Sequence, residues 1–191
     1  MTTHVALPHS IVLGFDNPRT WVATGNLIFE GEEAPLAAVE DRLETGFHDR
    51  FGKPADIIPR TAPAWRRLAA QNPFSEGSGA HVGIRVMRAP LDPDILAKLE
   101  TIATPDMRLE HRPEKWSAVF AESRCKIKEL EHRNEYDIQS DGLALRDGDL
   151  WIDFAGEPSE ARLLSHLTTT KPGIGTPRNA NTVKAMAAML D

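Results

Sequence analysis

The polar stretch at residues 176–182 holds the side chains of this sequence that are best suited to bind a ligand. It reads Thr-Pro-Arg-Asn-Ala-Asn-Thr, and a helical pattern follows it. The first N–H groups of a helix have no acceptor within the helix, and the helix dipole adds positive potential there, so anions are favoured. We therefore expect a phosphate or carboxylate site. The candidate ligand-binding residues are Arg178, Asn179, Asn181, Thr182 and Lys184, with Asn26 from a separate polar turn.

The same residues have a purely structural explanation, which the sequence leaves open. Asn181 or Thr182 would cap the final helix through a side-chain oxygen, while Arg178 would tie down the loop before it. Asn26 belongs to the turn at residues 24–26, and a tight hairpin turn requires Gly and Asn because these residues tolerate positive φ. A helix cap, a loop held by Arg178 and Asn179, a hairpin turn and a solvated Lys184 would then account for the candidates.

Metal, thiol and nucleotide-loop chemistry find little support in the sequence. The seven histidines are scattered without a His-x-x-x-His pair, and Cys125 is the only cysteine, so neither a metal site nor an internal disulfide is expected. Gly173-Ile174-Gly175 offers two glycines of a phosphate loop, but no Gly-Lys-Ser/Thr follows, and we interpret it as a flexible connector. We expect no cofactor, and the sequence does not identify a reaction.

The composition of the 191 residues, 41% hydrophobic and 26% charged, is that of an ordinary globular protein. No apolar run approaches the roughly 18 residues that span a bilayer, and the first residues lack the features of a secretory signal. We therefore expect no membrane association and a cytoplasmic location. The net charge of −6 argues against nucleic-acid binding, although residues 160–191 carry +2 and the remainder −8.

The first part of the chain alternates short strand patterns with helical ones. Apolar residues spaced three and four apart predict the helices, and turn residues predict the breaks between strands. The expected elements are a strand at 3–7, two strands within 18–30 that form a hairpin, a helix at 34–51 ended at Gly52, a strand at 55–58 and a helix at 63–70.

The second part begins again with a strand and ends with a helix. Val82, Ile84 and Val86 alternate with less apolar residues, the period of a half-buried strand, and Asp147-Gly148 is a strong hairpin signal. The remaining expected elements are a helix at 94–103, a further helix within 104–134, a helix at 158–167, a loop reaching Pro177 and a final helix striped by Val183, Met186 and Leu190.

This order favours the α+β class, because hairpins make the sheets antiparallel or mixed. We expect an N-terminal lobe at residues 1–74, a linker at 75–79 and a C-terminal lobe at 80–191 with a final capping helix.

Three motifs occur in the same order as in a known family. They are Arg19–Phe29 with the core Thr24-Gly25-Asn26, then Asn72-Pro73-Phe74, and then Arg178–Val183. On these motifs the chain resembles the bacterial domain-of-unknown-function family 1697, with interruptions, over most of its length. The resemblance implies two tandem ferredoxin-like α/β plaits, each a helix layer on an antiparallel sheet. It implies no activity.

The chain departs from the family pattern after its first predicted strand. Family members continue with a glycine-rich loop and a helix, whereas here Leu7 is followed by Pro8-His9-Ser10, so the first plait lacks a helix. An uncovered sheet face would expose an apolar patch that monomers avoid. We expect a deletion, an unresolved segment or a covering partner near residues 7–11.

Three functions remain open at the level of sequence. The favoured one is a module that binds a small anionic or nucleotide-like ligand at the residues named above. The second is an enzyme of unassigned class, which would show convergent titratable groups in a cleft. The third is a structural protein that forms a homodimer through a sheet face.

Overall fold

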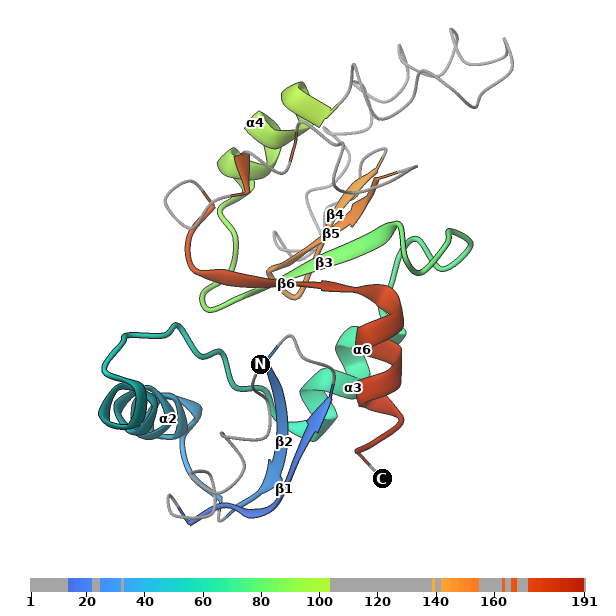
Figure 1. The fold of residues 1–191 in the computed structure, drawn as a ribbon. Helices are drawn as coiled ribbons and strands as arrows, with labels where there is room; N and C mark the ends of the chain where they lie inside the picture. The colour runs from blue at the N-terminus through green and yellow to red at the C-terminus, as the bar shows by residue number, and fades with distance from the viewer. Residues whose placement is uncertain are drawn as a thin grey trace, which may run out of the picture. The chain divides into compact units, whose positions relative to one another are not determined.

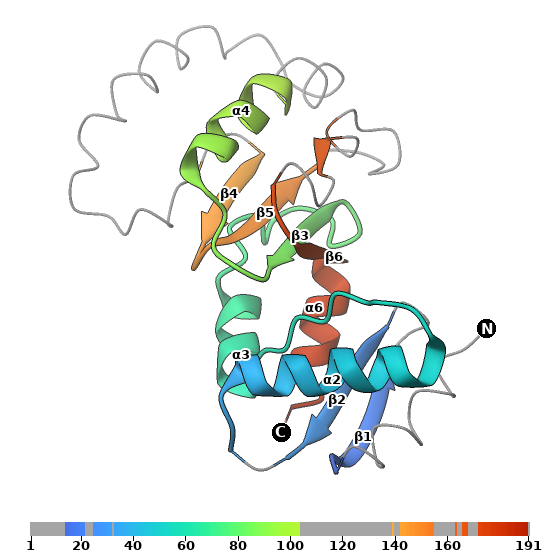
Figure 2. The same cartoon turned by 90° about the vertical axis from the view of Figure 1, so that its left-hand side faces the viewer.

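The chain folds into two units in this computed structural model. One unit comprises residues 1–69 and 182–191, and the other comprises residues 70–181. Each unit has a sheet of its own (Figures 1 and 2). The structure describes residues 14–21, 25–31, 33–103, 139, 142–154, 163, 166–167 and 172–190.

The sheet of the first unit is the predicted hairpin. β1 (Asp16–Trp21) pairs antiparallel with β2 (Asn26–Glu30), and Trp21 lies opposite Asn26 beside the turn. Gly25 has φ +81° in that turn, a conformation that glycine adopts without strain. The hairpin prediction is confirmed.

Helix α2 (Leu36–Phe51) confirms the predicted helix and its end. Gly52 adopts the left-handed conformation with φ 66°, and its N–H donates to the carbonyl of His48 at 2.7 Å, which closes the last turn. Leu43 is buried on the inner side of the helix. Within this unit α2 lies on one side of the hairpin (Figures 1 and 2).

Helix α3 (Ala62–Ala70) confirms the predicted short helix and is joined to helix α6 (Ala180–Ala187). The indole Nε1 of Trp65 donates to the carbonyl oxygen of Val183 at 3.2 Å. The guanidinium of Arg66 donates to the carbonyl of Leu190, just past the end of α6. Both hydrogen bonds tie α3 to the C-terminal segment within the first unit.

The strand predicted at residues 55–58 is wrong. The structure has no strand there, and the backbone N–H of Ile57 donates to the Oε1 atom of Glu44 on α2 at 2.9 Å. A short β-branched run resembles a strand in sequence, but a side chain of the neighbouring helix accepts its hydrogen bond in place of a second strand.

The sheet of the second unit has four strands in the order β4-β5-β3-β6, and every pairing is antiparallel. The predicted strand after residue 80 and the predicted hairpin after residue 142 are both confirmed. The strands are β3 (Val82–Met87), β4 (Leu143–Arg146), β5 (Asp149–Asp153) and β6 (Gly175–Asn179).

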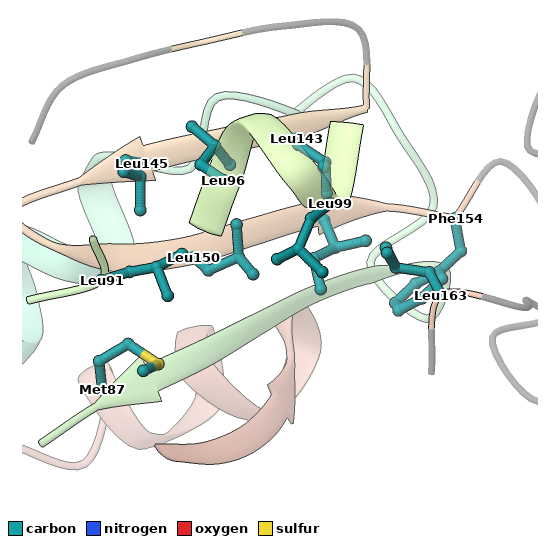
Figure 3. Close-up of a cluster of buried hydrophobic side chains, with 10 residues drawn as sticks. Met87, Leu91, Leu96, Leu99, Leu143, Leu145, Leu150, Phe154 and Leu163 are labelled. Carbon is teal, nitrogen blue, oxygen red and sulfur yellow. The ribbon is translucent and has the colours of Figure 1, made fainter. Parts of the chain in front are cut away.

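Helix α4 (Pro93–Ala103) confirms the predicted helix and covers one face of this sheet (Figure 2). Figure 3 shows Leu96 and Leu99 of α4 directed at side chains of the strands. The cluster also contains Met87, Leu91, Leu143, Leu145, Leu150, Ile152, Phe154 and Leu163. It is the core of this unit.

The turn between β4 and β5 depends on glycine for two reasons. Asp147 and Gly148 have φ of 50° and 85°, as a two-residue turn of the predicted type requires. A Cβ placed on Gly148 would also lie 2.8 Å from the Cα of Pro90. The conformation and the close approach of Pro90 both exclude a side chain there.

Strand β3 is not the half-buried strand that its alternation predicts. It lies between β5 and β6, and both its faces are buried: Ile84 is 1% exposed, and Arg85 on the other face is 5% exposed. A central strand pairs with neighbours on both edges. Here both faces are covered as well, so the less apolar residues Arg85 and Met87 are also buried.

Residues 175–179 form strand β6 in place of the predicted loop, so that prediction is wrong. Pro177 lies in this strand, which is at the edge of the sheet. Proline has no N–H to donate, and an edge strand tolerates it because only one side of the strand pairs with a neighbour. The helix after it begins at Ala180, earlier than a cap at Asn181 or Thr182 would place it. Val183 and Met186 are buried in α6 as predicted.

Several predicted elements lie outside the described residues. They are the strand at 3–7, the altered segment at 7–11, the helix within 104–134 and most of the helix at 158–167. The elements that are described are helices and two antiparallel sheets, which confirms the α+β class. In the described part of the chain no helix has both the length and the apolar character needed to cross a membrane.

Candidate anion-binding site

The C-terminal candidate residues lie along one continuous run of β6 and α6. Arg178 and Asn179 end the strand, and Asn181 stands in the first turn of the helix, all in the second unit. Thr182 and Lys184 follow on the same helix but belong to the first unit. Asn179, Asn181 and Lys184 are exposed.

Arg178 is engaged by oxygens of its own strand. Its Nη1 atom donates to the Oγ1 atom of Thr176 and to the carbonyl of Pro177, both at 2.6 Å. Desolvation by burial lowers the pKa of Arg178 below its ordinary value. Because Arg178 is opposite Ile84 in the ladder, it lies on the sheet face that turns away from α4.

Asn181 joins the start of α6 to the loop before β3. Its backbone N–H donates to the carbonyl of Gly79 at 3.4 Å, and a Cβ on Gly79 would lie 2.2 Å from the Oδ1 atom of Asn181. A side chain at residue 79 would therefore have to displace the amide group of Asn181. The contact gives Asn181 a structural role at the start of α6.

Asn26 has a structural role in the first unit. It is 4% exposed, and its Nδ2 atom donates to the carbonyl of Trp21 across the hairpin at 3.1 Å. Its amide thus closes the end of the β1–β2 ladder, which agrees with a structural role for Asn26 in the turn.

A second arginine of the same unit lies deeper than any of the predicted residues. Arg85 belongs to the central strand β3, directly opposite Leu150 of β5, so its side chain leaves the sheet on the face covered by α4. Among the residues described, it is the one basic side chain that is less than a tenth exposed. Burial lowers its pKa, since desolvation disfavours the charged form.

The guanidinium of Arg85 is only partly satisfied. Its Nη2 atom donates to the carbonyl oxygen of Gly173 at 3.1 Å, while its Nε atom is buried with no hydrogen-bond partner. No carboxylate in the described part of the chain forms an ion pair with it. Native structures rarely leave a buried donor of this kind unpaired, and a buried charge usually has a counter-charge.

A glycine-rich strap at residues 173–175 passes over Arg85. A Cβ on Gly175 would lie 2.9 Å from the Nε atom and 3.0 Å from the Cγ atom of Arg85, and 2.7 Å from the sulfur of Met87. The carbonyl of Ile174 accepts the backbone N–H of Arg88 at 2.9 Å and ties the strap to the end of β3. What the sequence suggested was a flexible connector is a fixed wall of the candidate site.

The sequence contained a weak signal for this site. Arg85 occupies a strand whose other residues are apolar or small. Two closely spaced glycines, which allow a close approach of the backbone, occur at residues 173 and 175. A charged residue in a strand is usually directed to solvent, and only the core cluster and the 173–175 segment that cover this face of the sheet show otherwise.

The first unit has a small acidic pocket beside α2. Its volume is about 290 Å³. The Glu44 carboxylate accepts the N–H of Ile57. Among the described residues, those of this pocket included, no three His, Cys, Asp or Glu side chains are arranged to hold a metal ion. The pocket is lined by Asp41, Glu44, Thr45, His48, Pro54 and Ala55.

The fold and this site define an α+β protein with a buried cation under a backbone strap. The sequence model of a family described as "Protein of unknown function (DUF1697)" matches residues 9–116, more than half of the chain. The chain belongs to this family, as its motifs predicted. No curated protein and no solved structure matches it.

Proposed function

We propose that the chain is a binding module for a small anion, with the guanidinium of Arg85 as the anchor of the site. The observation that supports this proposal is the burial of Arg85, which is 5% exposed and has an unpartnered Nε atom. Burying a charge without a counter-charge is unfavourable by several kcal/mol, in order of magnitude. An anionic ligand would supply the missing counter-charge.

The proposal keeps the ligand class that the sequence predicts but places the anchor elsewhere. Arg178 lies on the opposite face of the same sheet, and Thr176 and Pro177 supply acceptors to its Nη1 atom. Asn179 is on the same face as Arg85 by strand alternation and is exposed. The end of β6 and the first turn of α6, with Arg178, Asn179 and Asn181, are the alternative location for the same anion.

The finer architecture that we propose for the second unit is a ferredoxin-like plait. Its elements follow as β3, α4, β4, β5 and β6 along the chain, and the sheet order β4-β5-β3-β6 puts the first and third strands in the middle. This strand order supports the proposal, because the β-α-β-β-α-β motif has antiparallel strands under a helix layer. Arg85 would then project from a central strand into the space beneath the helices.

Binding of simple anions to matched variants tests the proposed function. Wild-type protein, Arg85→Met and Arg178→Met are each titrated with acetate, benzoate, phosphate and sulfate, with calorimetry and thermal unfolding as readouts. We expect at least one anion to bind wild type and Arg178→Met with similar affinity. The affinity of Arg85→Met for that anion is expected to fall by about a hundredfold, the scale of a charge-assisted hydrogen-bonded pair.

Three results would overturn this proposal in part or in whole. Equal anion affinity of wild type and Arg85→Met would show that Arg85 is not the anchor. Loss of binding in Arg178→Met alone would return the site to the start of α6. Binding of none of the four anions to the wild type would remove the proposed function itself.

A further inference from the structure

The charge of the ligand follows from the number of cations that the site buries. This inference rests on the proposed function, because it concerns the same anion. Arg85 carries one positive charge, and it is the one buried basic residue in the described part of the chain. Its neighbours on the sheet face are apolar: Leu150 lies directly opposite it, Met87 two residues along β3, and Leu145 pairs with Leu150.

These neighbours make a second negative charge unfavourable. Leu145 and Leu150 are 0% exposed and Met87 is 3% exposed, so water does not reach these three side chains. A singly charged ligand would form a neutral pair with the guanidinium. A doubly charged ligand would leave one charge without compensation in an apolar environment, where ions are strongly disfavoured.

The free donors of Arg85 also have a defined geometry. The Nε and Nη2 atoms lie on one edge of the planar guanidinium; Nη2 uses one hydrogen for the carbonyl of Gly173, and Nε–H has no acceptor. This edge offers two roughly parallel N–H groups, the arrangement that the two oxygens of a carboxylate match. The strap leaves the approach to Nε open because Gly175 has no side chain; a Cβ there would lie 2.9 Å from Nε and would fill that position.

We infer that the ligand of Arg85 is a singly charged carboxylic acid, and not a phosphate or sulfate dianion. Its two carboxylate oxygens accept the Nε–H and Nη2–H groups, and its remaining atoms face the apolar side chains of Met87 and Leu150. The site thus recognises an organic acid by charge and planarity.

Three anions of graded charge and shape test this inference at one pH and constant ionic strength. Benzoate is a planar monoanion, methanesulfonate is a tetrahedral monoanion, and sulfate is a tetrahedral dianion; acetate is the small control for benzoate. We expect the carboxylates to bind tightest, methanesulfonate more weakly and sulfate most weakly. Sulfate is expected to have a dissociation constant at least about tenfold above that of the better carboxylate.

The outcomes separate the two claims. Sulfate binding as tightly as the better carboxylate overturns the inferred ligand class but leaves an anion-binding module in place. Methanesulfonate binding as tightly as that carboxylate overturns the planar recognition. If none of the four anions binds, the proposed function fails, and the inferred ligand class fails with it.

A glycine variant provides a second, independent readout of the same geometry. Gly175→Ala places a methyl group against the Nε and Cγ atoms of Arg85 and must displace the guanidinium or the strap. We expect carboxylate affinity to fall by about tenfold or more while Arg85 keeps its charge. Gly77→Ala, which adds a methyl group 3.0 Å from the Cγ2 atom of Val82 and 3.3 Å from the carbonyl oxygen of Phe74 in the same unit, is the matched control for a tight contact away from Arg85 and should bind as wild type. Unchanged affinity in Gly175→Ala would contradict the role of the strap.

Discussion

Replacing Arg85 by methionine is expected to stabilise the ligand-free protein. Methionine keeps most of the length of the side chain but removes the charge and the unpartnered Nε–H. If Arg85 is retained for ligand binding and not for folding, its replacement should raise the stability of the protein and weaken ligand binding.

The magnitude follows from the contacts of the side chain. The loss is one hydrogen bond, 3.1 Å long, to the carbonyl of Gly173, worth about 1.5 kcal/mol, and water can replace it because Gly173 is exposed. The gain is relief from a buried unsatisfied donor, about 1–3 kcal/mol, and from a desolvated charge, several kcal/mol. A net increase of about 1–3 kcal/mol in the free energy of unfolding is expected.

The sign of this effect should not depend on pH in the ordinary range. Burial lowers the pKa of Arg85 in the folded state. A basic group with a lowered folded pKa destabilises the fold fully wherever the group stays protonated in both states, and this cost decreases only as pH rises through the lowered folded pKa toward the unfolded one. Arg85→Met should therefore be more stable than wild type by a similar amount at every pH from about 6 to 9.

Urea unfolding of the ligand-free proteins measures this difference. A stabilised variant shows a higher midpoint with an unchanged slope of free energy against urea concentration. Arg146→Met is the matched control: Arg146 is half-buried and donates to Leu145 and Gln139 at 2.7 and 2.5 Å, so its loss should cost about 0.5–1 kcal/mol. If Arg85→Met instead lowers the free energy of unfolding by more than about 1 kcal/mol, Arg85 holds the fold together and the reasoning is refuted.

Two further predictions concern stability. Gly148→Ala, with φ 85° and a Cβ position 2.8 Å from the Cα of Pro90, should lose about 2–4 kcal/mol of unfolding free energy, whereas Gly25→Ala, with φ 81° and open space, should lose only about 1–2 kcal/mol. Equal losses in thermal unfolding would contradict the role of Pro90. Trp65→Phe removes the indole donor to Val183 and should lose about 1–2 kcal/mol in urea unfolding, and a loss below about 0.3 kcal/mol would contradict that hydrogen bond.

Elements whose signals are local could be predicted from the sequence. The hairpin around Asp147-Gly148 was predictable because alternation and turn chemistry both lie within a dozen residues. Helix α2 was predictable for the same reason, since its apolar spacing and its end at Gly52 are adjacent in the chain. The segment at 55–58 was not, because its hydrogen-bond acceptor, Glu44, belongs to another element.

The candidate site was likewise predictable only where its signal is local in the sequence. The sequence predicted an anion-binding site near the start of α6 from the general properties of helix starts, and the ligand class stays a prediction. It did not predict Arg85, because a charged residue in an alternating strand is normally placed on the solvent side.

The sequence by itself determined the α+β class, most of the described elements and the family, because propensity, apolar spacing and turn residues act over short stretches of chain. Only the tertiary structure decided that Arg85 is buried and that residues 173–175 form a wall against it. β3 lies between β5 and β6 in the sheet. No local sequence pattern predicts pairing between strands that lie about 60 to 90 residues apart in the chain. Arg85 thus lies on the strand that pairs with β6, next to the polar stretch near the C-terminus.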